Sequence, residues 1–192
     1  TGRVEILKLK RNNTATKGCK LYLTKPLGVG ILTTAQKQGK LLPKHEHIAP
    51  DSMSKLNKIG QDLANIKGVK AMTDVTGFGL LGHLTEICEG SDLSAEIDID
   101  NIPTFPDVQQ YINKGCIPGG THRNWESYGH NVQLKEESNK LILCDPQTSG
   151  GLLIAVEENA IEEVESFLRE NEIECSSFGS LKPRSEILIK VV

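Results

Sequence analysis

The chain has 192 residues, of which 38% are hydrophobic and 24% charged, and its formal net charge at pH 7 is −3. This composition is typical of a packed globular domain and excludes a disordered or fibrous chain. The small net charge provides no overall basic field for nucleic acid. No apolar run reaches the roughly 20 residues of a membrane-spanning helix, and no hydrophobic signal segment opens the chain. We therefore expect neither nucleic-acid nor membrane partners.

Five widely spaced cysteines indicate a reducing compartment. Their odd number argues against a complete disulfide framework, and no two of them stand at the spacing of a zinc-binding pair. We therefore expect a cytoplasmic protein. The five residues are Cys19, Cys88, Cys116, Cys144 and Cys175.

The first third of the chain predicts one strand followed by two helices. Residues 20–24 form an apolar run typical of a strand, and prolines and glycines then break it before a helix that starts within residues 31–35. From residue 51 onward, apolar residues recur at three- and four-residue steps, which predicts a one-sided helix with Asp51 as its N-cap. These apolar residues are Met53, Leu56, Ile59, Leu63 and Ile66.

The middle of the chain predicts a second pair of helices around a strand. A helix is expected over residues 80–88, after a glycine-rich turn, and another short helix after Pro106. Residues 94–100 alternate in polarity as a half-buried strand does. Residues 115–131 have no clear period, so we expect a loop or an irregular helix there. The inward residues of the strand are Ala95, Ile97 and Ile99.

The last third predicts three strands and one helix. Residues 141–144 and 152–156 are compact apolar runs typical of buried strands, and residues 186–190 predict a final strand. Asn159 and Glu162 stand at the spacing of a capping box before an amphipathic helix. Because helices and strands alternate irregularly, we expect an α+β fold with a single mixed sheet packed with helices, not a doubly wound parallel sheet.

The densest candidate site lies in residues 72–83, where Asp74 precedes a turn that contains Gly77 and Gly79. Glycines let backbone N–H groups approach a ligand closely, and the start of the following helix favours an anion. A carboxylate beside a phosphate is reasonable if Mg²⁺ bridges the two. On spacing alone a second interpretation stays open, in which Asp74 is simply the N-cap of that helix.

Two further polar segments are candidates. Residues 118–124 place Thr121, Arg123 and Asn124 after two glycines, and an Arg can make bidentate contacts to phosphate. A plain surface turn has the same composition. Residues 145–151 fit either a structural turn between strands or the polar rim of a pocket. Physical reasoning leaves both pairs of alternatives open.

These three segments resemble, in order and spacing, the signature segments of the selenophosphate synthetase (selenide, water dikinase) family. Residues 23–30, Leu-Thr-Lys-Pro-Leu-Gly-Val-Gly, are similar to that family's entry segment, and residues 73–83 to its most diagnostic stretch. The resemblance covers nearly the whole chain, residues 20–192. It implies the C-terminal-domain fold of the aminoimidazole ribonucleotide synthetase-like superfamily, which also contains thiamine monophosphate kinase and the hydrogenase-maturation dehydratase.

The resemblance implies an enzyme that converts selenide, ATP and water to selenophosphate, AMP and orthophosphate, assisted by Mg²⁺ and a monovalent cation. Carried over residue by residue, Asp74 matches an aspartate that binds the metal. Asp145 and residues 148–150 are expected to give structural support, and His83 to be a packed or surface histidine. The residues expected to bind the nucleotide are Thr76, Gly77, Gly79, Thr121, Arg123 and Asn124.

In that family a first domain contains the reactive Cys or selenocysteine, a catalytic Lys, most metal-binding aspartates and much of the dimer interface. No such segment is present here, and the chain opens at Thr1 instead of Met. We therefore expect residues 1–19 to remain from an interdomain connection and residues 20–192 to form the C-terminal domain. Its expected partners are its own N-terminal domain and, in the full-length parent, a second subunit of a homodimer. Alone, the chain should be inactive.

Two alternatives accompany this expectation. The chain could belong to a related ATP-dependent kinase or synthetase of the same superfamily, or it could be a non-catalytic interaction module with the same fold. The presence of Asp74 together with intact glycines argues against the interaction module.

Overall fold

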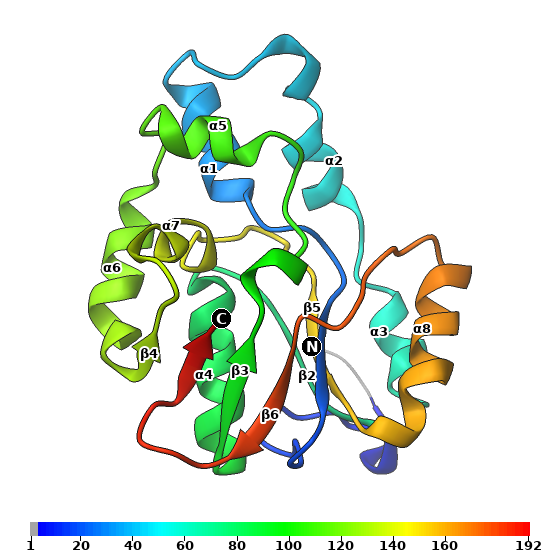
Figure 1. The fold of residues 1–192 in the computed structure, drawn as a ribbon. Helices are drawn as coiled ribbons and strands as arrows, with labels where there is room; N and C mark the ends of the chain where they lie inside the picture. Colours follow the sequence, from blue (N-terminus) through cyan, green and yellow to red (C-terminus); the bar gives the residue numbers. More distant parts are fainter. Residues whose placement is uncertain (1–3) are drawn as a thin grey trace.

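A mixed β-sheet runs through the molecule and has helices packed on both faces (Figure 1). The computed structural model describes residues 4–192, and within them the sheet has seven strands in the order β2-β5-β1-β6-β3-β7-β4. Strand β7 is parallel to β3 and β4, whereas the other pairs are antiparallel. The predicted α+β fold with a single mixed sheet is confirmed. The strands are β1 (Lys20–Leu23), β2 (Val69–Asp74), β3 (Leu93–Ile97), β4 (Val132–Gln133), β5 (Leu152–Val156), β6 (Gly179–Pro183) and β7 (Ile189–Val191).

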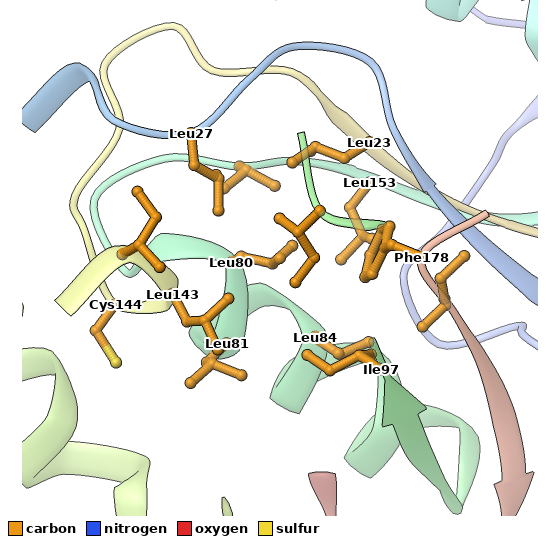
Figure 2. Close-up of a cluster of buried hydrophobic side chains, with 14 of the residues drawn as sticks. Leu23, Leu27, Leu80, Leu81, Leu84, Ile97, Leu143, Cys144, Leu153 and Phe178 are labelled. Carbon is orange, nitrogen blue, oxygen red and sulfur yellow. The ribbon is translucent and has the colours of Figure 1, made fainter. Parts of the chain in front are cut away.

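Alternation along the strands sends apolar side chains into two cores, one on each face of the sheet. Leu23 of β1 lies in the core that includes Leu84 of α4, and Figure 2 shows both residues with Leu153 of β5. Tyr22, the neighbour of Leu23, lies in the second core with residues of α3 and α8. The helices are α1 (Val29–Lys37), α2 (Ile48–Ser54), α3 (Ile59–Leu63), α4 (Gly79–Ser91), α5 (Val108–Asn113), α6 (Gly119–Tyr128), α7 (Lys140–Leu143) and α8 (Ile161–Glu170).

The helices α1, α2 and α5 lie together beyond one end of the sheet, at the top of Figure 1. Within residues 4–192, the structure contains no helix whose length and apolar character would let it span a membrane. The predicted elements 20–24, 80–88 and 152–156 are confirmed as β1, α4 and β5, and the helix after Pro106 as α5. Strands β2, β4 and β6 were not predicted.

The predicted single helix over residues 51–66 is wrong. The segment forms α2 and α3 with a break between them, and Asp51 lies inside α2, whose N-cap is His47. The physical reason is a distant side chain: the Lys25 ammonium donates to the carbonyl oxygens of Ser52 and Lys55, and Lys55 adopts an extended conformation. Backbone oxygens that a continuing helix would use are thereby bound to Lys25.

Several local predictions in the second half of the chain are also wrong. Residues 141–143 lie in the four-residue helix α7, and Cys144 is its C-cap, so the predicted strand is absent. A short apolar run does not distinguish a buried helix from a buried strand. Residues 119–128 form the regular helix α6. The helix α8 has Ala160 as its N-cap without a side-chain bond, so Asn159 and Glu162 form no capping box. Ile99 lies in a 3₁₀ turn beyond β3.

Candidate functional site

Three loops meet at one edge of the sheet because β5 is antiparallel to both of its neighbours. Strands β1 and β2 end at this edge, and β5 begins there. The Val75 N–H donates to the Gly151 carbonyl oxygen at 2.8 Å, and the Lys25 ammonium donates to the Ser149 carbonyl oxygen at 2.7 Å. We define residues 24–30, 74–79 and 145–151 as the loop junction. Segments far apart in the sequence therefore meet at one place in the structure.

Asp74 is the last residue of β2, and its side chain is exposed at the loop junction. Its backbone is paired with Leu152 of β5. The N-cap of α4 is Phe78, which makes no side-chain cap, so the interpretation of Asp74 as that N-cap is wrong. Among residues 4–192, no hydrogen bond or ion pair engages the Asp74 carboxylate, whose oxygens are available to a cation.

The turn after Asp74 contains two glycines with different surroundings. Gly79 has a φ of 69°, and a Cβ atom there would lie 2.8 Å from the carbonyl carbon of Cys144, so only glycine allows this close packing. Gly77 is exposed, and a Cβ atom there would meet nothing within 4 Å. Gly79 therefore shapes the turn, whereas Gly77 faces open space that a ligand can enter.

Helix α6 holds this turn through two side chains. The Asn124 amide nitrogen donates to the carbonyl oxygens of Gly77 at 2.9 Å and Cys144 at 3.0 Å, and the residue is 7% exposed. The Tyr128 hydroxyl donates to the Phe78 carbonyl oxygen, and burial raises the pKa of this hydroxyl. Asn124 therefore connects three segments of the chain. Nothing in the sequence pattern pointed to Tyr128.

The other two residues predicted on this segment have different environments. Arg123 is exposed, so its guanidinium can reach a ligand outside the domain. Thr121 is 1% exposed, and within the described residues its buried hydroxyl oxygen has no hydrogen-bond partner. The structure thus brings Asn124 to the turn after Asp74, whereas it records no hydrogen bond from the side chain of Thr121 or Arg123 to that turn.

Asp145 is fully buried at the start of α1. Its Oδ2 accepts hydrogen bonds from the Gly30 N–H at 3.0 Å and from Gln147 Nε2 at 2.8 Å, whereas its Oδ1 has no partner within residues 4–192. Gln147 Oε1 accepts from the Val29 N–H at 3.3 Å. Burial raises the pKa of Asp145 to about 7. These contacts support the expected structural role of Asp145.

Lys25 is a buried cation that the sequence analysis did not single out. Its ammonium donates to the carbonyl oxygens of Ser52 at 3.1 Å, Lys55 at 2.7 Å and Ser149 at 2.7 Å. Burial, followed by repulsion from the Lys55 ammonium, lowers the pKa of Lys25. The only sequence signal was its position in the segment 23–30. Lys25 fixes the loop before β5 against the loop after α2.

His83 was expected to be either packed or at the surface, and the structure shows it packed, with 7% of the residue exposed. It lies on α4 and contacts Thr76 in the preceding turn. The Thr76 carbonyl oxygen accepts from the N–H groups of Gly79 and Gln147, both at 3.0 Å. Thr76 is therefore held by neighbours on several sides, and it shapes the turn together with Gly79.

A magnesium ion fits this site only if Asp74 shares its coordination with other groups. In the part of the chain that the structure describes, no three His, Cys, Asp or Glu residues form a group that could hold a metal. Mg²⁺ is commonly bound by one or two carboxylates together with substrate phosphates and water. The free Asp74 carboxylate can supply one such ligand.

A groove of about 570 Å³ lies outside the loop junction, between residues 4–10, α3 and Met72.

Comparisons with known proteins identify close relatives of this sequence. The family model described as AIR synthase related protein, C-terminal domain, matches residues 16–191. A selenide, water dikinase from Haemophilus influenzae (strain 86-028NP) is 56% identical over 97% of this chain and 54% of the relative. One from Photobacterium profundum is 56% identical over 95% of this chain and 54% of the relative. The chain spans about half the length of the curated relatives it matches, and the predicted resemblance is confirmed.

Solved structures with lower identity share the fold. A thiamine-monophosphate kinase from Stenotrophomonas maltophilia K279a has a TM-score of 0.66 and 14% identity, covering 95% of this chain and 52% of that chain. The hydrogenase maturation protein HypE in complex with ATP has a TM-score of 0.66 and 19% identity, covering 95% of this chain and 48% of that chain. These matches agree with the α+β architecture.

Proposed function

This chain belongs to the family of AIR synthase related C-terminal domains, and we propose that it forms the C-terminal part of a selenide, water dikinase. The proposed enzyme converts selenide, ATP and water to selenophosphate, AMP and orthophosphate. The observation that supports this proposal best is the 56% identity over 97% of the chain to the selenide, water dikinase of Haemophilus influenzae. The ATP named in the HypE complex, a protein of the same fold, agrees with a nucleotide substrate.

In the proposed enzyme, residues 20–192 are the C-terminal domain and residues 1–19 belong to the connection with an N-terminal domain. That other domain supplies the nucleophile, the catalytic Lys and most metal ligands, and the full enzyme is a cytoplasmic homodimer. The isolated chain is then inactive. Phosphoryl transfer depends mainly on positioning and electrostatics, so one carboxylate and a few donors from this chain can matter greatly.

The predicted site residues of the loop junction and of α6 have distinct tasks in this proposal. The exposed Asp74 carboxylate would hold Mg²⁺, and the bound ion would offset the negative charge of the ATP phosphates. The exposed backbone of Gly77 lets a phosphate approach, and the Arg123 guanidinium contacts the nucleotide from α6. Thr76, Gly79 and Asn124 act by keeping the turn in place, whereas Thr121 is buried on α6 and, within residues 4–192, makes no side-chain hydrogen bond to the turn. The proposed enzyme also uses a monovalent cation.

The fold alone also suits a related ATP-dependent kinase or synthetase, because a thiamine-monophosphate kinase shares it with a TM-score of 0.66. The two candidates differ in whether selenide is needed for turnover. A non-catalytic module of the same fold would make no use of the Asp74 carboxylate, which is exposed and, within residues 4–192, unpaired.

Product analysis of the full-length parent tests the proposal. We expect AMP and selenophosphate to form only when selenide is present with ATP and Mg²⁺. Both products are measured by ³¹P NMR. The isolated 192-residue chain should form neither product. Selenide-independent turnover by the full-length parent would favour a related kinase, and appreciable selenide-dependent AMP from the isolated chain would contradict the need for the other domain.

A further inference from the structure

The side chain of His83 folds back from α4 onto the turn that precedes this helix. Its Nε2 atom lies 3.0 Å from the backbone nitrogen of Thr76 and 3.2 Å from Thr76 Oγ1. Long side chains on a helix lean toward its N-terminus, which explains how a residue on α4 reaches a residue before the helix. The Phe78 ring lies beside the imidazole, with the ring centroids 6.1 Å apart.

The hydrogen bond from Thr76 determines the tautomer of His83. A backbone N–H can only donate, so Nε2 must carry a lone pair, and the proton of the neutral ring is on Nδ1. The Nδ1 atom lies 3.4 Å from Glu86 Oε2, and Asn12 Nδ2 is 3.5 Å from the same oxygen. Nδ1 is buried and makes no well-formed hydrogen bond within residues 4–192. The Glu86 carboxylate therefore favours the Nδ1–H tautomer by its charge.

The backbone at Thr76 is held by hydrogen bonds on both sides, and His83 is the acceptor for its N–H group. The Thr76 carbonyl oxygen accepts from Gly79 and Gln147, and the preceding N–H, that of Val75, donates to Gly151. Without His83, the Thr76 N–H would have no acceptor among the described residues. Leaving such a half-buried donor unpaired is unfavourable, so the turn would move to find another partner.

We propose that His83 is a positioning residue for the Mg²⁺ and nucleotide site, because it fixes the turn that separates Asp74 from Gly77. This inference rests on the function proposed above for that site. It also divides the backbone donors of the turn into two groups. The N–H groups of Thr76 and Gly79 are occupied by acceptors within the protein. Within residues 4–192, the Gly77 N–H has no such acceptor, so it remains available to a phosphate oxygen.

NMR of the 192-residue chain tests the hydrogen bond without any ligand. In the wild-type chain we expect the Nδ1–H tautomer of His83 and a scalar coupling between the Thr76 backbone nitrogen and His83 Nε2. His83→Phe keeps an aromatic ring and removes the acceptor, so hydrogen exchange of the Thr76 amide should become roughly fivefold to tenfold faster. His83→Gln offers a side-chain oxygen near the position of Nε2 and should restore much of the protection.

The wild-type measurement decides the geometry even if His83→Phe does not fold. An Nε2–H tautomer, or no coupling to Thr76, would overturn the proposal. Unchanged Thr76 exchange in a folded His83→Phe variant would overturn it as well. His130→Phe is the matched control, because His130 is an exposed histidine outside the loop junction, and Thr76 exchange should stay at the wild-type rate.

Kinetics of the full-length parent test the role of this hydrogen bond. We expect His83→Phe to raise the KM for Mg²⁺-ATP by roughly tenfold with a smaller change in kcat, and His83→Gln to recover most of the loss. Asp74→Asn is measured in the same assay. If Asp74→Asn lowers turnover but His83→Phe changes neither KM nor kcat, the positioning role of His83 is wrong and the proposed site stands. If Asp74→Asn has no effect, the proposed site fails, and the role of His83 fails with it.

Discussion

The loop junction lies at the ends of strands β1, β2 and β5 and the layer formed by α3 and α8 covers one face of them, and the two regions are built from different side chains. In the layer, Leu63, Val164 and Leu168 make a continuous apolar core with the strands. In the loop junction, the buried residues include Lys25, Asp145 and Gln147, which are hydrogen-bonded to backbone or side-chain groups. Apolar packing tolerates small shifts, whereas an unpaired buried polar group costs about 1–3 kcal/mol. The geometry of the junction is therefore determined by directed bonds.

This contrast gives opposite expectations for substitutions in the two regions. Substitutions in the α3–α8 layer should lower the free energy of unfolding without changing the site. Substitutions in the loop junction should change the pH dependence of stability, the turnover or the shape of the turn after Asp74.

The largest expected effect is the pH dependence caused by Asp145. Its pKa is raised to about 7 by burial, so the folded state binds the proton more tightly than the unfolded state. The stabilisation is fully present below the unfolded pKa, near 4, and is lost as pH rises through about 7. At about 1.4 kcal/mol per pKa unit, the loss is about 4 kcal/mol.

Denaturant unfolding of wild type and Asp145→Asn from pH 4 to pH 8 measures this loss. The asparagine has no proton to release, so the difference in unfolding free energy between the two proteins should change steadily between pH 4 and pH 7 and then level off. A difference that is independent of pH would show that the folded state does not raise the pKa of Asp145.

The second largest effect is on turnover in the full-length parent. Asp74→Asn keeps the shape of the side chain but removes the negative charge that would hold Mg²⁺. Single electrostatic contacts of this kind are worth about 3–4 kcal/mol, which corresponds to roughly a hundredfold or more in rate. The melting temperature should change little because the carboxylate is exposed. Selenophosphate formation at saturating Mg²⁺ tests this, and unchanged turnover would remove Asp74 from the site.

The third prediction compares one substitution in each region. Lys25→Met removes the donor to three carbonyl oxygens, and we expect a loss of about 3 kcal/mol in unfolding free energy. Leu168→Ala in α8 should cost a similar amount, about 2–3 kcal/mol, because it leaves a cavity in the α3–α8 layer.

NMR chemical shifts separate the two variants. Lys25→Met should shift the amide signals of residues 149–151 and of the break between α2 and α3, because both segments lose a shared anchor. Leu168→Ala should leave those signals in place. Equal shifts at residues 149–151 in both variants would contradict the view that directed bonds control the loop junction.

The sequence predicted an element correctly where the apolar residues of that element repeat in a regular pattern. Strand β1 and helices α4 and α8 were predicted because their apolar residues repeat at the spacing that their buried faces require. The helix over residues 51–66 failed because its interruption depends on Lys25, which lies 27 and 30 residues away from the carbonyl groups that it binds. A local pattern contains no information about such a bond.

The candidate site shows the same limit. The motif around Asp74 located the turn, in which Gly77 is exposed with open space at its Cβ position; its contact with a nucleotide stays a prediction. Asn124 was predicted as a nucleotide ligand, and this stays a prediction, but its amide nitrogen already donates to two backbone carbonyl groups. Residue type predicts which side chains can donate hydrogen bonds, whereas the choice between backbone and ligand depends on contacts across the fold.

The smallest effects are expected at the two glycines of the turn. Gly79 determines the shape of the turn, whereas Gly77 is exposed. Gly79→Ala forces a residue with a Cβ atom into a φ of 69° and against the Cys144 backbone at 2.8 Å, so we expect a loss of about 2 kcal/mol in unfolding free energy. Gly77→Ala meets no atom within 4 Å and should stay within about 0.5 kcal/mol of wild type. Urea denaturation of the 192-residue chain measures both.

The Gly77 variant has a second readout in the full-length parent. The added methyl group would occupy the open space beside the Gly77 backbone, so the KM for Mg²⁺-ATP should rise although stability is unchanged. Equal losses of stability in both variants would mean that Gly77 is also packed in solution. A stable Gly77→Ala variant with an unchanged KM would instead show that the nucleotide approaches another part of the loop junction. Because Gly77 is the position where stability and binding are expected to separate most cleanly, it distinguishes a ligand surface from a turn that is merely well packed.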